Sequence, residues 1–214
     1  MITKLIHLKT YSLAILIVLT TSCVFSQSDT NTWKLQFAAG INMPSETRQS
    51  EGFLIKDVNF PTINLGVQHM FSKKFGAKLD FGYSRATNDN KSSEFKFNYS
   101  RFNAQLVYDF SSDLMFILPS EFAIVTHLGP GMSFTSPLGS FKENKHTFIN
   151  GMLGLEVHLG ISESLSVYSD VSYILALNPE DKYNSVIDGF SFNGNLLTVT
   201  LGVSVSLSGC RYCN

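Results

Sequence analysis

The side chains with the most obvious chemical potential are charged and imidazole groups that recur among small, polar neighbours in separate segments. Several of them, such as Asp80, His127 and Glu156, lie about five residues from the nearest short turn, which suggests one shared layer. Unpaired charges in such a layer would be costly, so we expect a hydrogen-bonded network in which Lys78, Arg101 and the histidines pair with the acids. The full set is Lys34, Lys78, Asp80, Arg101, Asp109, His127, Glu156, His158 and Asp170.

Two interpretations of this charged set are open. The groups could form a gate or a proton-sensitive site, since histidine changes its charge near neutral pH. They could also fill the interior of the fold and hold its segments together, and we interpret the network in this structural sense.

Three common motifs of hydrolases, metalloproteases and nucleotide-binding enzymes are absent from the sequence. There is no G-x-S-x-G, no H-E-x-x-H and no phosphate-cradling glycine loop. His69 has the opposite parity to the charged set, and no Ser, Asp or Glu stands beside it, so we interpret it as an interfacial residue. We expect no enzymatic activity, no cofactor and no metal.

A C-x-x-C motif, Cys210 to Cys213, stands near the end of the sequence. A zinc site would need two further ligands, and a redox motif would need a helix in a βαβ context. In an oxidising compartment a local disulfide, or a link to another protein, is the expected outcome.

The strands that must position these residues are predicted from a strict alternation of apolar and small polar residues. From Leu197 to Leu207 every odd position is a branched aliphatic residue, and every even position is Thr, Ser or Gly. Successive side chains on a strand point to opposite faces, so such a run has one greasy face and one small, polar face. The pattern recurs and predicts strands at about 33–42, 62–71, 75–85, 94–110, 122–134, 147–161, 165–177 and 196–207.

Two stretches depart from the alternation. Phe95, Phe97 and Tyr99 have the parity of the polar face, so we expect a bulge there or a strand that extends beyond the bilayer. The connection 111–121 holds the apolar run 114–119 without alternation, which predicts a short interfacial helix or a coil at the membrane surface.

Composition and charge narrow the class of protein. Charged residues make up 15% of the chain, below the roughly 25% of ordinary soluble domains. The formal net charge is -1, which gives no electrostatic case for nucleic acid. Mean hydropathy is only slightly positive, which excludes a helical membrane protein and suits a barrel diluted by alternation.

The first 26 residues have the pattern of a secretory signal, which leaves 27–214 as one barrel domain. Lys4, His7 and Lys9 form a basic start, 13–19 is an apolar core, and 24–26 precede a plausible cleavage point at Gln27. The apolar core is shorter than the roughly 20 residues of a spanning helix. Lipidation at Cys23 is the alternative, and both interpretations predict export.

The lengths of the connections alternate along the chain. Turns 72–74 and 162–164 are short and 111–121 is moderate, whereas 43–59, 86–93, 135–146 and 178–195 are long and polar. Outer-membrane barrels place short turns in the periplasm and long loops outside, so we expect both termini in the periplasm. Lipid cannot satisfy backbone hydrogen bonds, so the sheet must close, and eight strands leave no room for a large pore.

Aromatic residues gather near the predicted strand ends, where interfacial girdles belong. On the periplasmic side they are Trp33, Phe71, Phe75, Tyr108, Phe110 and Phe122, and on the other side Phe60, Tyr83 and Phe134. The fold predicted is therefore all-β: an eight-stranded, antiparallel, up-and-down transmembrane β-barrel.

The sequence resembles a known family in four features. These are the start of the mature chain at Gln27, the eight alternating strands, the glycine-rich run 127–131 and the terminal run 201–204. This pattern is similar to the outer-membrane β-barrel domain of the OmpA-like superfamily, in the versions found in Bacteroidetes-type, Gram-negative bacteria. The resemblance implies a location in the outer membrane and contact with its lipid and lipopolysaccharide.

Three functions are compatible with this pattern. We favour a structural or adhesion-like surface protein, a monomer whose long loops meet an extracellular ligand or surface. A lipid-modifying enzyme would need a His paired with Ser or Asp on the outer face. A soluble exported barrel that binds an apolar ligand would turn its greasy faces inward and carry charges outside.

Overall fold

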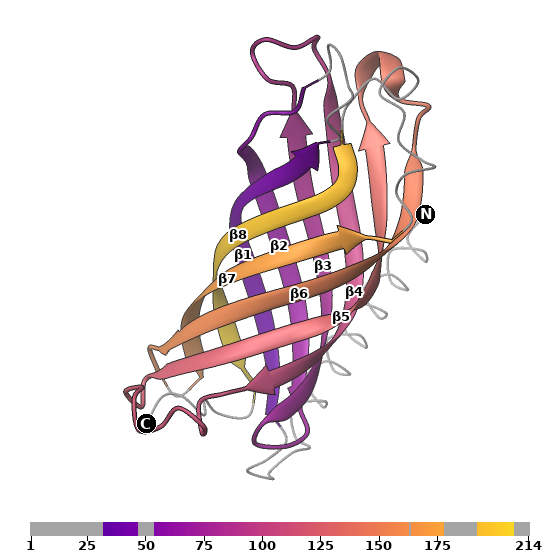
Figure 1. The fold of residues 1–214 in the computed structure, drawn as a ribbon. Helices are drawn as coiled ribbons and strands as arrows, with labels where there is room; N and C mark the ends of the chain where they lie inside the picture. Colours follow the sequence, from indigo (N-terminus) through magenta and orange to yellow (C-terminus); the bar gives the residue numbers. More distant parts are fainter. Residues whose placement is uncertain (1–31, 47–53, 163, 178–191, 208–214) are drawn as a thin grey trace, which may run out of the picture.

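The computed structural model describes residues 32–46, 54–162, 164–177 and 192–207, and within them the chain forms a closed barrel (Figure 1). Each strand pairs antiparallel with its neighbour in sequence, and β8 pairs with β1 to close the sheet. None of the helical structure in these ranges is long and apolar enough to cross a membrane. The strands are β1 (Thr32–Glu46), β2 (Asn59–Met70), β3 (Phe75–Thr87), β4 (Lys96–Asp109), β5 (Phe122–Pro137), β6 (His146–Gly160), β7 (Leu165–Ala176) and β8 (Phe192–Ser206).

Several strands run further toward the long connections than alternation predicts. β1 continues to Glu46 and β8 begins at Phe192, and these two residues pair with each other. The predicted loops 43–59 and 178–195 are therefore shorter than expected. Backbone pairing does not depend on side-chain polarity, so a ladder can continue where the alternation of the sequence has ended.

Of the two structures expected near Phe95, Phe97 and Tyr99, a bulge or a strand that extends beyond the bilayer, the bulge is absent. The β3–β4 register is unbroken from Phe75 opposite Tyr108 to Thr87 opposite Lys96. The three aromatic residues lie on the inward face and are buried. The bulge was wrong because it assumed that large apolar residues always face outward, whereas the interior itself becomes apolar at this end. The extended strand stays a prediction.

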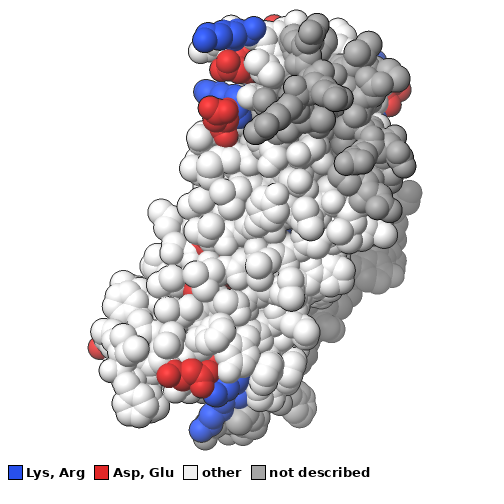
Figure 2. Space-filling view, in the orientation of Figure 1, with Lys and Arg blue, Asp and Glu red and all other residues white. Residues whose placement is uncertain are grey.

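The two faces of the sheet differ as a membrane barrel requires. Large apolar side chains point outward all round the barrel, including Leu106 and Leu201, which are 69% and 68% exposed. Figure 2 shows Lys, Arg, Asp and Glu mainly at the two ends of the face in view, with an almost uncharged wall between them. The inward apolar faces and charged outer wall that a soluble ligand-binding barrel would need are not found in the described strands.

The interior has two tiers. Toward the short turns it is polar and charged, whereas toward the long connections it is apolar. Ile55, in the connection after β1, belongs to the apolar tier and forms an isolated bridge with Asn88. The apolar tier consists of Ile55, Ala86, Phe95, Phe97, Tyr99, Phe148, Met152, Ile174, Ala176, Phe192 and Leu196.

The connection 111–121 forms consecutive turns and not the short helix that was one of its two expected structures. Backbone N–H groups of Leu114 and Leu118 donate to the carbonyls of Phe110 and Leu114, at 3.0 and 2.9 Å. Its apolar tip is open, with Phe116 93% and Ile117 81% exposed. The only 3-10 helix in the described ranges is η2 (Gly139–Phe141), between β5 and β6.

Candidate functional site

Two buried ion pairs lie in the polar tier of the interior. Lys78 Nζ on β3 lies 2.5 Å from Glu156 Oε1 on β6, and Arg101 on β4 pairs with Asp80 on β3. All four side chains are almost fully buried. The first pair is notable for its topology, because β3 and β6 are separated by two strands.

Glu156 is the centre of the first group of contacts. Its Oε2 accepts from Gln36 Nε2 at 3.0 Å and contacts His158 Nε2 at 2.7 Å. His158 is held in turn by its ring, which stacks on Tyr168 with centroids 4.9 Å apart. Both oxygens of this buried carboxylate are therefore satisfied, which offsets the cost of removing the charge from water.

Arg101 is the centre of the second group. Besides Asp80, its guanidinium donates to Asn64 Oδ1 at 3.0 Å, to Asn103 Oδ1 at 3.2 Å and to the Met152 sulfur at 3.0 Å. These partners come from β2, β4 and β6. The planar fork of arginine suits such a junction, because it offers five donors in a fixed geometry.

His127 lies beside an acid and a hydroxyl, and the arrangement must be tested against a catalytic triad. His127 Nε2 contacts Asp170 Oδ1 at 3.3 Å and Ser172 Oγ at 3.5 Å, and Ser172 donates to Asp170 at 2.7 Å. In a triad the acid and the nucleophile engage opposite ring nitrogens. Here both contact Nε2, and Nδ1 is buried without a hydrogen-bond partner, so this geometry does not activate the serine.

Asp109, Lys34 and His69 are the remaining candidate residues, on β4, β1 and β2. Asp109, at the end of β4, accepts from the Ser111 backbone N–H at 2.9 Å and from its hydroxyl at 2.5 Å. Lys34 is buried on the inward face of β1. His69 faces outward and stacks on Trp33 with centroids 4.3 Å apart, with no acid in that contact.

The cysteines Cys23, Cys210 and Cys213, together with the signal segment 1–26, lie outside the described residues. Within the described ranges, no group of three His, Cys, Asp or Glu side chains is placed to hold a metal ion.

Uncharged residues that the search for ionisable groups missed complete the interior. Asn103 donates to Asn150 Oδ1 at 2.6 Å, and Asn150 donates to Ser133 Oγ at 2.7 Å. Tyr99 contacts the same Ser133 oxygen at 2.6 Å and so joins the polar tier to the apolar one. Strand parity already placed Asn103 and Asn150 inward, and that signal could have found them.

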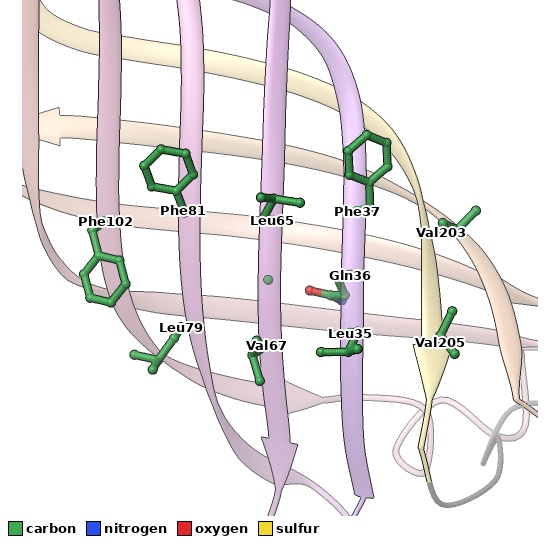
Figure 3. A pocket seen from close by; sticks show the side chains of 11 residues that line it. Leu35, Gln36, Phe37, Leu65, Val67, Leu79, Phe81, Phe102, Val203 and Val205 are labelled. Carbon is green, nitrogen blue, oxygen red and sulfur yellow. The ribbon is translucent and has the colours of Figure 1, made fainter. Parts of the chain in front are cut away.

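A shallow hollow of about 560 Å³ lies on the outer wall of the barrel, over Gly66 (Figure 3). Two outward rows of side chains cross β1, β2 and β3 around it, and Gln36 beneath points to the interior. The row nearer the long connections is Phe37, Leu65 and Phe81, and the row nearer the short turns is Leu35, Val67 and Leu79.

No protein-family model and no curated protein match the sequence. Solved structures match across most of the chain. The outer membrane protein OprG from Pseudomonas aeruginosa has a TM-score of 0.58 at 11% identity, covering 83% of this chain and 96% of its own. A major outer membrane protein from Thermus thermophilus has 0.56 at 11%, covering 82% and 99%. Neisserial surface protein A has 0.56 at 13%, covering 81% and 96%.

These likenesses define the class of fold. The chain has the closed, eight-stranded, all-antiparallel architecture of small outer-membrane β-barrels, as the sequence predicts.

Proposed function

We propose that the chain is a small outer-membrane β-barrel protein with a structural or surface-interaction role, in the manner of an adhesin. The observation that carries this proposal is the apolar outer wall around a closed, polar core. In water that wall would be a very large exposed apolar surface, whereas a bilayer would cover it. The closed sheet has no unpaired edge, so its backbone groups need no water inside the bilayer.

The orientation follows from the connections. The turns after β2, β4 and β6 face the periplasm, and the long connections after β1, β3, β5 and β7 face outward. Residues 1–26 serve as the export signal, and both termini are periplasmic. The resemblance to OmpA-like barrels of Bacteroidetes-type, Gram-negative bacteria belongs to this proposal.

The interior acts as a plug and not as a pore. Support comes from its burial: Arg101, His127, Phe97 and Phe192 are each at most 2% exposed. A barrel of eight strands is only wide enough for its own side chains. The interior network is structural, and the chain carries out no catalysis.

The partners of such a protein are the lipid and lipopolysaccharide around its wall, and an extracellular ligand or surface met by its long connections. The barrel works as a monomer, and it does not bind nucleic acid.

Cell fractionation tests the proposal, followed by gel migration with and without boiling. We expect an outer-membrane band that shifts on heating, and no stable conductance when the protein is inserted into a planar bilayer. Recovery in the soluble periplasm without a heat shift would overturn the membrane placement. A steady open channel would overturn the plug.

A further inference from the structure

Arg85 is a cation on the outward face of β3, close to the long connections. Its side chain is exposed, and no carboxylate of the described residues forms an ion pair with it. Lys96 lies on the facing strand, two positions nearer the tip of the hairpin, where it is opposite Thr87. It differs from Arg85 because it pairs with Glu94 at 3.4 Å. Arg85, on the strand wall of this hairpin, therefore keeps its charge available for a ligand.

Neutral groups hold the Arg85 guanidinium in place. Nε donates to Asn98 Oδ1 at 2.9 Å, and one Nη donates to the Tyr83 hydroxyl oxygen at 3.1 Å. The Tyr83 hydroxyl donates to the same Asn98 oxygen at 2.9 Å, which closes a triangle across two paired strands. The remaining guanidinium N–H groups suit bidentate contact with a phosphate.

The height of Arg85 on the wall matches a membrane boundary. Phe75, in the aromatic group at the short-turn end, lies ten residues before Arg85 on β3. Ten residues span about 33 Å of strand, or about 25 Å along the axis at a tilt of about 40°. The apolar band of an outer-membrane barrel is also about 25 Å tall, so Arg85 lies where lipid headgroups begin.

The hollow on the outer wall lies on the membrane side of Arg85. Phe81 lines it on the same outward row of β3, and Phe102 lines it from the paired position on β4 (Figure 3). Phe81 is four residues from Arg85, about 13 Å along the strand. A phosphate at Arg85 and an acyl chain in the hollow therefore fit one lipid molecule.

We propose that Arg85, with Tyr83 and Asn98, binds the phosphate of a membrane lipid, and that the hollow over Gly66 receives an acyl chain of that lipid. The site rests on the proposed membrane placement, which puts this end of the wall in the outer leaflet. The ligand class is a phosphorylated, acylated lipid, bound on the outside of the barrel.

Native mass spectrometry of the detergent-folded protein with added lipid tests the site. The probes are lipid A, phosphatidylglycerol and phosphatidylcholine, and the variants are Arg85→Gln and Lys74→Gln. Lys74 is a matched control, because it is an exposed cation at the opposite end of the barrel and pairs with Asp113. All three lipids carry phosphate, but the choline ammonium offsets the phosphate charge of phosphatidylcholine. We therefore expect wild type to retain the net anionic lipid A and phosphatidylglycerol over zwitterionic phosphatidylcholine, with about five- to tenfold weaker binding only in Arg85→Gln.

A second variant separates a lipid from free phosphate. Val67→Phe fills the hollow and leaves Arg85 untouched, so it should weaken the binding of long-chain lipid A more than that of short-chain analogues. Equal lipid retention by wild type and Arg85→Gln would overturn the site. Inorganic phosphate that competes as well as lipid, without chain-length dependence, would overturn the lipid as its occupant.

The heat shift on gels separates this site from the proposed function. The wild-type protein could show the heat shift and enter vesicles, yet retain no more lipid than Arg85→Gln does. That result would refute the lipid site alone. Failure of wild type to enter vesicles would refute the membrane placement and the site together.

Discussion

Lys78 and Glu156 meet across the barrel interior with Nζ and Oε1 2.5 Å apart, although their strands share no ladder. The strands β4 and β5 lie between β3 and β6 in the sheet. The contact therefore ties two separate parts of the wall together, in addition to the backbone ladder. Because both groups are buried, the loss of one leaves the other charge without its partner.

Removal of this lysine should be strongly destabilising. We expect Lys78→Met to lower the free energy of unfolding by about 3–5 kcal/mol, since Glu156 would keep a buried charge. Urea unfolding of the protein in lipid vesicles measures the change. Lys91→Met, at an exposed loop lysine, should leave stability unchanged, and Lys78→Met with Glu156→Gln should recover part of the loss. Equal stability of the two lysine variants would contradict the ion-pair role.

Two glycines offer a matched test of how closely β4 and β5 approach. A Cβ at Gly129 would overlap the carbonyl oxygen of Ala104, whereas a Cβ at Gly151 would meet nothing within 4 Å. Gly129→Ala should therefore force the strands apart and cost several kcal/mol or prevent folding. Gly151→Ala should fold as wild type does. The heat-shifted fraction after refolding measures both, and an unaffected Gly129→Ala would contradict the close approach.

The apolar tier should contribute much of the stability of the barrel. Phe97 is buried and stacks on Phe192 of β8 with centroids 5.1 Å apart. We expect Phe97→Ala to cost about 3–5 kcal/mol in the same urea assay, because it leaves a cavity in a packed interior. Phe116→Ala removes an equal side chain from an exposed tip and should cost little. If both variants lost the same stability, the packing of this tier would be in doubt.

The contact between Lys74 and Asp113 predicts a pH dependence at the short-turn end. The hydrogen bond from Lys74, and then that from Tyr108, lowers the pKa of the Asp113 carboxyl, and the same bond raises the pKa of Lys74. A lowered folded-state pKa means that the Asp113 contribution is complete above the unfolded value, near pH 4, and is lost as pH falls through the folded value. For Lys74, the contribution holds below its unfolded pKa and is lost as pH rises through the folded one.

An NMR titration of the Asp113 carboxyl in micelles measures this directly. Lys74→Met should raise the pKa of Asp113 more than Tyr108→Phe does, since Lys74 is the larger cause. Identical titration curves in wild type and Lys74→Met would show that the pairing does not persist in solution.

The exposed tip of the connection 111–121 should insert into the lipid interface. The chain has one tryptophan, so Phe116→Trp in a Trp33→Phe background reports on this position alone. We expect blue-shifted emission that brominated lipids quench. Ser162→Trp in the same background, in the polar turn after β6, should emit as in water. A water-like spectrum at position 116 would place the tip outside the lipid.

Alternation alone predicted most of the architecture, because a strand in a membrane wall must sort its side chains by face. Leu197 to Leu207 illustrates this: its odd positions point outward in the structure, and its inward positions are small. The same rule placed Lys78, Arg101 and Glu156 on the inward face. At Phe97 and Tyr99 the parity was right, but the bulge inferred from it was wrong. Parity reports which face a side chain occupies and not whether that face is polar.

The partners of the buried charges required the tertiary structure. Alternation assigned Lys78 and Glu156 to the same interior but could not bring them together, because their separation depends on the stagger accumulated over the strands between them. The outward triangle of Arg85, Tyr83 and Asn98 likewise depends on the β3–β4 register, which sets Arg85 opposite Asn98. The sequence determined which face each residue takes, and the register of the closed sheet decided which residues share a height and a neighbour.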